Sequence, residues 1–333
     1  MSGIARVVRL ARRPGPDIRP EDFKIAEVDL AEPAEGEVQV RNTWMSLDPY
    51  MRLPLTGQGG LHAAMAVGAE MEGAAIGVVE RSAAPALPVG ATVMSRRGWR
   101  DRFVAPAAGL QRVDGEFPPQ WRLGVLGLTG LTAYAGVEFV LKPVAGETLF
   151  VSGAAGAVGS IACQLAKRRG ARVIATAGSA EKVDWLLREL GVDAACDYKS
   201  EDVGAFLARI CPEGLDAYFD NVGGPTLDAV LGVMKPWGRI GLCGAIAQYG
   251  DDNYRAGPRD FFTIIEKGLT VTGFNAGLWG ARAGGEMLQA LGQMLARGDL
   301  VWRETVVEGL ETVPAAFVSL FDGRNLGKLL VRL

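Results

Sequence analysis

The sequence predicts an α/β protein in which a doubly wound parallel sheet is joined to a smaller β-barrel domain. Two patterns predict this fold class. Between about residues 126 and 300, apolar runs alternate with segments of helical periodicity, whereas residues 1–125 carry short alternating runs separated by glycine and proline. A chain of 333 residues is long enough for two domains with separate cores.

Residues 1–125 are expected to form the barrel domain. Alternation of apolar and polar side chains predicts strands at residues 4–10, 37–42, 74–80 and 92–95. Glycine and proline, as in the pair Pro14-Gly15 and at Pro33, interrupt these runs and predict turns and long loops between the strands.

Residues 126–299 are expected to form the parallel sheet and its helices. An apolar strand at 149–152 is followed by a glycine-rich turn and a helix, and five further strands are predicted at 172–177, 193–198, 216–222, 239–243 and 270–274. Helical patterns separate them at 179–190, 201–210, 225–234 and 261–267. After a long helix at 280–298, residues 300–333 should return to the first domain and complete it, with strands at 304–307 and 328–333 and a helix at 313–321.

The glycine-rich turn predicts a dinucleotide site. Ala154, Gly156 and Gly159 occupy the three small positions of the Rossmann fingerprint, which let a backbone approach a pyrophosphate at a helix N-terminus. Small residues also allow any helix to pack closely on a strand, but the strand–helix order that follows favours the nucleotide interpretation. Residues 148–166 carry no charge and could be taken for a membrane span, although their glycines, hydroxyl residues and Gln164 argue against it.

The charge and composition of the chain limit which binding partners and which compartment are expected. A net charge of −3 gives no reason to expect nucleic acid or an anionic membrane, and the basic run from Arg96 to Arg102 is read as a solvated turn. The basic N-terminal segment has no long apolar core, so a signal peptide is not predicted and the cytoplasm is the expected location. Four separated cysteines without a CxxC pair indicate buried thiols in a reducing compartment.

The second predicted strand bears on the choice of cofactor. Its end, residues 174–179, has no Asp or Glu to hold a ribose 2′-hydroxyl, and Lys182 follows within one helical turn. These residues favour NADP over NAD, although Lys182 could instead be a solvated helix lysine. Zinc is not expected, because His62 is the only histidine and the first cysteine is Cys163. His62 is interpreted as a surface or substrate-edge residue.

Six stretches together resemble one family. They are residues 44–52 (WMSLDPYMR), 130–134 (GLTAY), 154–159, 219–224 (FDNVGG), 243–249 (CGAIAQY) and 323–328 (GRNLGK). Their order is similar to that of the zinc-independent alkenal/one (double-bond) reductases of the medium-chain dehydrogenase/reductase superfamily. The resemblance implies a GroES-like β-barrel catalytic domain, a Rossmann domain, NADPH as cofactor and a homodimer. It departs from the family at 127–130, where GLTG replaces GMPG, and in the charged loop after Tyr249.

The resemblance also implies roles for single residues. Tyr249 would lie near the substrate carbonyl, Lys182 and Tyr198 near the 2′-phosphate and the phosphates, and Asn221 and Asn325 near the nicotinamide. The other cofactor-binding residues would be Ala154, Ala155, Gly156, Ala157, Val158, Gly159, Gly178 and Val222. Tyr50, Thr129 and Tyr249 would line the substrate pocket.

The expected reaction is NADPH-dependent reduction of the C=C bond of an enal or enone. Hydride would go to the β-carbon while Tyr249 or a cofactor hydroxyl polarises the carbonyl. Tyr249 could instead be a packed aromatic residue, and Tyr254 is a nearby competitor. Asp48 and Arg52 are expected to be structural, and could pair with each other across a turn. Two other functions remain open, a quinone reductase and a non-catalytic NADPH-binding regulatory protein. The apolar strand at 269–274 could pair with a second copy.

Overall fold

The computed structural model describes residues 3–56, 63–249 and 258–333. The chain forms two compact units. Unit 1 comprises Met1–Gly124, Glu304–Asn325 and Leu329–Leu333, and unit 2 comprises Val125–Arg303 and Leu326–Lys328. Each unit therefore contains a segment from the C-terminal end of the chain.

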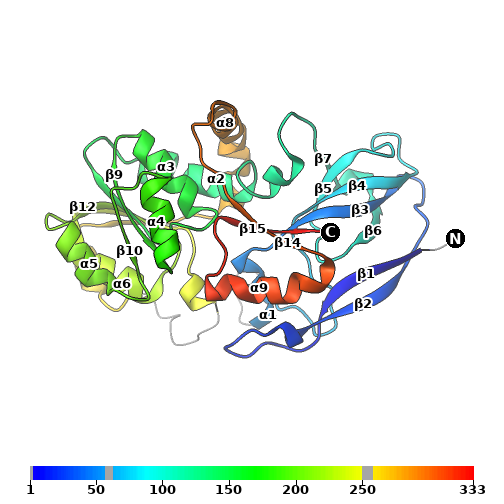
Figure 1. Cartoon of the computed structure of the whole chain (residues 1–333), viewed down its shortest axis with the longest axis horizontal. Coiled ribbons are helices and arrows are strands. Elements are labelled where there is room, and N and C mark those ends of the chain that lie inside the picture. The colour runs from blue at the N-terminus through cyan, green and yellow to red at the C-terminus, as the bar shows by residue number, and fades with distance from the viewer. Residues whose placement is uncertain (1–2, 57–62, 250–257) are drawn as a thin grey trace. The chain divides into compact units, whose positions relative to one another are not determined.

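Unit 2 is built on one six-stranded parallel sheet, with the strand order β10-β9-β8-β11-β12-β13. Its strands are β8 (Thr148–Val151), β9 (Arg172–Ala177), β10 (Ala194–Asp197), β11 (Leu215–Asp220), β12 (Met234–Leu242) and β13 (Thr270–Gly273). Its helices are α2 (Leu128–Ala135), the π-helical turn η5 (Gly136–Leu141), α3 (Gly159–Arg168), α4 (Ala180–Arg188), α5 (Val203–Ile210), α6 (Gly224–Val233), α7 (Phe261–Glu266) and α8 (Ala276–Arg297). Figure 1 shows α4 in green and α5 and α6 in yellow-green; α4 packs on β9 and β10, and α6 packs on α5 and β11. The order reverses between β8 and β11, which is the doubly wound topology that the sequence predicts.

Local sequence sets where these elements begin and end. Ser179, Asp202 and Asn275 each cap a helix, since their side chains accept a backbone N–H from its first turn. The Asn275 cap starts α8 four residues before the predicted position of 280. The predicted strand at 216–222 ends earlier, at Asp220, because its carboxylate accepts the N–H groups of the next turn. Helix α2 was not predicted, because almost every residue in it is buried and no apolar stripe marks it.

Unit 1 contains two sheets whose strands pair mainly in the antiparallel direction. β1 (Gly3–Leu10) pairs with β2 (Phe23–Leu30), and a seven-stranded sheet has the order β14-β15-β3-β4-β5-β7, with β6 also on β3. The strands of this sheet are β3 (Glu37–Ser46), β4 (Ala75–Ser82), β5 (Thr92–Ser95), β6 (Arg102–Pro106), β7 (Gln111–Arg112), β14 (Glu304–Glu308) and β15 (Lys328–Arg332). Two short helices, α1 (Leu53–Thr56) and α9 (Val313–Asp322), complete the described regular elements together with single 3₁₀ turns. Strands β2 and β6 were not predicted.

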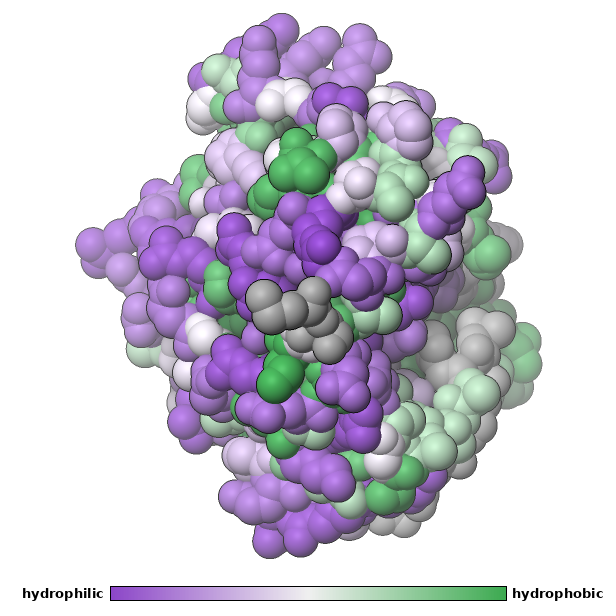
Figure 2. All heavy atoms as spheres, turned by 90° about the vertical axis from the view of Figure 1, so that its right-hand side faces the viewer, coloured by the Kyte–Doolittle hydropathy of each residue, from purple (hydrophilic) through white to green (hydrophobic). Residues whose placement is uncertain are grey.

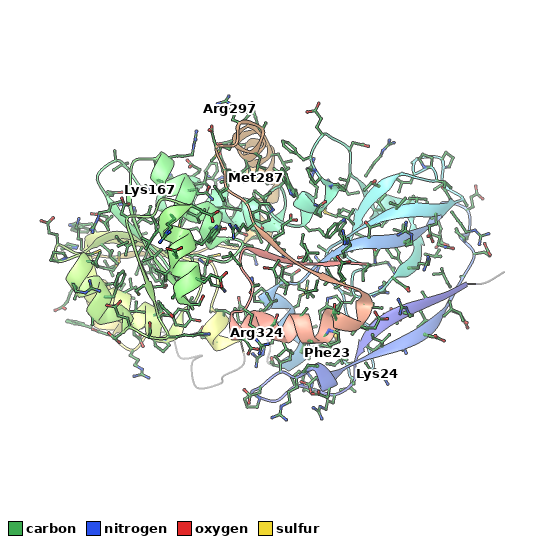
Figure 3. All side chains as sticks on the ribbon, in the orientation of Figure 1. Phe23, Lys24, Lys167, Met287, Arg297 and Arg324 are labelled. Carbon is green, nitrogen blue, oxygen red and sulfur yellow. The ribbon has the colours of Figure 1, made fainter. Side chains whose placement is uncertain are left out.

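The C-terminal tail supplies part of the core of unit 1. Phe317 of α9 is fully buried against the rings of Trp99 and Phe23, with ring centroids 5.2 and 5.9 Å away. Strand β15 lies between β14 and β3. In Figure 3, Phe23 lies toward α9 while its neighbour Lys24 is at the outside of β2, as expected for alternating strand positions.

Truncating Phe317 should therefore destabilise unit 1. We expect Phe317→Ala to lower the free energy of unfolding by about 3–5 kcal/mol, because it removes a buried aromatic ring and leaves a cavity. Val89 is 64% exposed on the same unit, and the matched change Val89→Ala should cost less than about 0.5 kcal/mol. Urea unfolding followed by tryptophan fluorescence measures both, and equal small losses would contradict this account of the core.

The surface seen in Figure 2 is mainly hydrophilic, with hydrophobic side chains in small groups. Small separated apolar groups of this kind are normal on a protein surface. Among the helices of residues 3–56, 63–249 and 258–333, none has the length and apolar character that a membrane crossing requires.

Candidate functional site

The glycine-rich turn of unit 2 joins β8 to α3. Its backbone enters a left-handed conformation at Gly153 (φ +59°), and the N–H of Ala154 donates to the carbonyl of Thr176 at the end of β9 (2.9 Å). A Cβ atom at Gly159 would lie 2.6 Å from the Gly153 carbonyl oxygen, so only glycine allows the first turn of α3 to approach this closely. Gly156, Ala157 and Val158 are partly exposed, and they lead into a helix N-terminus whose N–H groups suit an anion.

The C-terminal segment of unit 2 lies against this turn. Gly327 donates its N–H to the carbonyl of Ala155 (2.9 Å) and forms an isolated parallel bridge with Gly156. Gly327 has φ +69°, and a Cβ there would lie 2.1 Å from the Arg303 carbonyl oxygen, so glycine is required. Asn325 is partly exposed at the end of the α9 segment of unit 1, two residues before this contact.

A basic region lies at the ends of β9 and β10. Tyr198 donates its N–H to Ala177 (3.0 Å), and its hydroxyl would be only 3.0 Å from a Cβ atom at Gly178. Lys182 is half-buried on the first turn of α4, where burial and the nearby charge of Lys199 lower its pKa. Two neighbouring ammonium groups of this kind suit a phosphate. The sequence reasoning missed Lys199, although its position directly after Tyr198 was a usable signal.

The turn after β11 is fastened to the end of β8. Asn221 donates its side-chain amide to the Ser152 carbonyl (2.8 Å) and its backbone N–H to the Ser152 hydroxyl (3.0 Å). Gly223 then takes φ +68° and leads into α6. Both Asn221 and Val222 are partly exposed at the sheet edge where doubly wound folds bind their ligands.

Tyr249 follows the single 3₁₀ turn η6 (Ile246–Gln248) after β12. This loop packs on the previous turn, since the N–H of Ala247 donates to the carbonyl of Val222 (3.1 Å). Burial raises the pKa of Tyr249, and a hydrogen bond from the Ala245 backbone opposes part of that rise. The hydroxyl therefore keeps its proton at neutral pH and can donate it to an acceptor. Tyr254, the competing tyrosine, lies outside the described residues.

Thr129 lies on the first turn of α2 in unit 2. Its side chain is buried, and within the described part of the chain its hydroxyl has no hydrogen-bond partner. A buried hydroxyl without a partner is uncommon and marks a place where a ligand or water can donate or accept.

The remaining candidates lie in unit 1. Tyr50 is half-buried in the turn η2 (Pro49–Arg52), where burial and the charge of Asp48 raise its pKa to about 12. Asp48 accepts a hydrogen bond from Ser46, and Arg52 donates to the Pro16 carbonyl and stacks over the Phe321 ring (4.9 Å). Asp48 and Arg52 thus each have other partners within unit 1. An ion pair between the two residues is not needed to explain why they are buried. His62 lies outside the described residues.

Comparison with known proteins relates these features to one family. A family model described as the N-terminal domain of oxidoreductase matches residues 6–113, and one described as zinc-binding dehydrogenase matches residues 157–294. The chain is 36% identical to the NADPH-dependent curcumin reductase of Escherichia coli (97% of this chain, 95% of that protein). It is 38% identical to the NADP-dependent 2-alkenal reductase of Nicotiana tabacum (93% and 91%). The chain belongs to the alkenal/one reductases of the medium-chain dehydrogenase/reductase superfamily.

Solved structures agree with this assignment. The structure of CurA from Vibrio vulnificus in complex with NADPH matches this alkenal/one reductase with a TM-score of 0.93 at 35% identity, over 98% of both chains. The NADPH complex of Escherichia coli quinone oxidoreductase matches with a TM-score of 0.77 at 21% identity, over 98% and 100% of the two chains, which shows the shared fold. The predicted family and the predicted fold class are both confirmed.

The cysteines of this alkenal/one reductase differ partly from expectation. Cys163, Cys196 and Cys211 are buried, as predicted, but Cys243 is partly exposed because β12 ends at Leu242 and the chain turns there into a loop. Removal from water raises the pKa of all four thiols. In residues 3–56, 63–249 and 258–333, no three His, Cys, Asp or Glu side chains are grouped so as to hold a metal ion.

Proposed function

We propose that this protein reduces the C=C bond of α,β-unsaturated aldehydes and ketones with NADPH. The observation that carries the proposal is the position of Tyr249, a protonated hydroxyl on the loop that packs against the Val222 turn at the ligand-binding edge of the sheet. Relatives that share 36–38% of its residues are a curcumin reductase and a 2-alkenal reductase. Unit 2 would bind the cofactor, and unit 1 would be the GroES-like catalytic domain.

The cofactor residues fit NADPH in their chemistry. The closely packed turn at 154–159, with the α3 N-terminus, would hold the pyrophosphate, and Lys182, Tyr198 and Lys199 would hold the 2′-phosphate. Gly178, whose missing side chain leaves room for the Tyr198 ring, would allow close approach of the adenosine half. Asn221, Val222 and Asn325 would contact the nicotinamide half. When bound, NADPH supplies the hydride.

The protein's own part in the chemistry is to hold and polarise the substrate. Tyr249 would donate a hydrogen bond to the carbonyl oxygen, where negative charge develops as the β-carbon accepts hydride. A donor held in place by its surroundings costs no reorganisation when that charge appears. Thr129 and Tyr50 would line the pocket, and the proton needed at the α-carbon would come from Tyr249, a cofactor hydroxyl or water.

Product identification tests this function. Oxidation of NADPH, with NADH beside it, would be followed with a small conjugated enone and with a quinone. We expect a saturated ketone and a clear preference for NADPH. Turnover of the quinone alone would favour the quinone-reductase alternative, and tight NADPH binding without turnover of either would contradict an enzymatic role toward both substrate classes.

We further propose a homodimer joined through the β13 edge of unit 2. Strand β13 is at the end of the sheet order, and edge strands offer N–H and C=O groups to another chain. Large apolar side chains are exposed nearby, on α7 at Phe261, Phe262 and Ile265, and at Trp237. The backbone N–H of Trp237 donates to the carbonyl of Lys267, directly after α7 (2.7 Å). The free thiols suit a reducing compartment, for which we propose the cytoplasm.

A charge on this apolar surface should separate the two copies. Ile265 is 71% exposed, and we expect Ile265→Glu to convert a dimer into a monomer of 35.3 kDa, because the carboxylate would be buried without a partner. Sedimentation equilibrium measures the mass, with Val89→Glu as the control that should remain dimeric. A parent protein that sediments as a monomer would contradict the proposed dimer.

A further inference from the structure

One buried carboxyl group at the candidate site has no role in the reaction proposed above. Asp220, the last residue of β11, is fully buried. Its Oδ1 atom lies close to four donors, which are the Tyr218 hydroxyl (2.6 Å), the N–H groups of Val222 and Gly223 (2.8 Å each) and the Ser152 hydroxyl (3.3 Å). Its Oδ2 atom is buried without a hydrogen-bond partner among the described residues.

The same aspartate links three strand ends. Its side chain reaches Ser152 directly after β8, and its carbonyl accepts the N–H groups of Cys243 (2.8 Å) and Gly244 (3.1 Å) after β12. Ser152 in turn holds Asn221 at two points, through its hydroxyl and its carbonyl. The turn at residues 221–223 is thus fixed from inside the sheet.

Burying a carboxyl group here costs more free energy than is needed to hold a turn. Asparagine or serine could accept the two N–H groups of a turn, whereas a carboxyl group must be removed from water in a fully buried position. Burial raises the pKa of Asp220, and the hydrogen bonds from Gly223, Tyr218 and Val222 oppose that rise. Beyond the turn, the carboxyl group also accepts the Tyr218 hydroxyl, which is itself 3.0 Å from Ser152 Oγ. The network therefore resists movement of the turn relative to β8.

We infer that Asp220 is a positioning residue that fixes the turn at residues 221–223 against the nicotinamide half of the cofactor. This inference rests on the proposed binding of NADPH. Asp220 itself is fully buried and acts through Asn221 and Val222, which are partly exposed at the site. The adenosine half, recognised at Lys182 and Tyr198, should be bound independently of this network.

Comparing two ligands distinguishes binding at the nicotinamide half of the site from binding at the adenosine half. Calorimetry would measure the dissociation constants of NADPH and of 2′,5′-ADP, which has the 2′-phosphate but no nicotinamide. For Asp220→Asn and Ser152→Ala we expect the NADPH affinity to fall about tenfold or more, since hydrogen bonds to the buried carboxyl group are lost or weakened. The affinity for 2′,5′-ADP should stay within about twofold of the parent value, which is the usual effect of a change away from a contact.

The same strand provides a matched control. Asp216, near the opposite end of β11, accepts the N–H of Thr148 on β8 (2.8 Å) and pairs with Lys235. Asp216→Asn should lower the unfolding midpoint yet leave both affinities unchanged. Equal losses of NADPH and 2′,5′-ADP affinity in Asp220→Asn would show that the whole cofactor site has loosened, and would overturn the inference. Unchanged affinity for both ligands would overturn it as well. A parent protein that binds neither ligand would overturn the proposed function and this inference with it.

Discussion

Replacing Tyr249 with phenylalanine should lower kcat for enone reduction by about 10²- to 10³-fold, the usual effect of removing one donor to a developing oxyanion. The ring would remain, so the loop packing on Val222 should persist and the dissociation constant of NADPH should hardly change. Single-turnover measurements with a small enone separate the hydride step from product release.

Tyr134→Phe is the matched control for this variant. Tyr134 donates its hydroxyl to Glu286 (2.6 Å) within unit 2, so its loss should reduce stability without reducing kcat. An unchanged kcat in Tyr249→Phe would remove Tyr249 from catalysis and leave a cofactor hydroxyl as the group that polarises the carbonyl.

Removing the Lys182 ammonium group should weaken NADPH binding by about 10- to 100-fold, because a charge-assisted hydrogen bond to the 2′-phosphate is lost. NADH, which has no such phosphate, should bind Lys182→Ala and the parent equally. Because burial and Lys199 lower the pKa of Lys182 in the free protein, its charge is lost at a lower pH than that of an ordinary lysine. The preference for NADPH over NADH should therefore decline as the pH rises toward that pKa.

Lys167→Ala provides the comparison for Lys182→Ala. Lys167, labelled in Figure 3, is in the last turn of α3 and pairs with Asp193 (2.8 Å), at the opposite end of the helix from the glycine-rich turn. Its loss should leave the affinities for both cofactors unchanged. Equal effects of the two lysine variants on NADPH binding would contradict the assignment of Lys182.

Much of the fold could be predicted because its signals are local. The strand at 172–177 was predicted with its observed bounds, since five of its six residues are buried in a parallel strand and the run is apolar throughout most of its length. The glycine-rich turn was recognisable because close packing at Gly159 excludes a Cβ atom, and this requirement fixes the residue type. Helix α2, which is buried nearly all round, has no comparable periodicity and was missed.

The network around Asp220 could not be predicted in the same way. Ser152 and Asp220 are separated by 68 residues, and their contact depends on the adjacency of β8 and β11. Sequence reasoning singled out the following residues, Asn221 and Val222, but gave no means of knowing which side chain holds them. Arg52 is a similar case, because its partners, the Pro16 carbonyl and the Phe321 ring, come from distant parts of the chain.

Unit 1 cannot finish folding until residues 304–333 have been synthesised. Strands β14 and β15 and helix α9 come from residues after 303, and β15 fills a position next to β3 inside the sheet. A ribosome therefore releases nearly all of unit 2 first, while Trp99 and Phe23 still lack the covering Phe317 ring and β3 still has an open edge. For that interval the nascent chain exposes apolar surface and unpaired strand, the features that chaperones bind, so shortening the C-terminus should reduce yield before it affects the cofactor site.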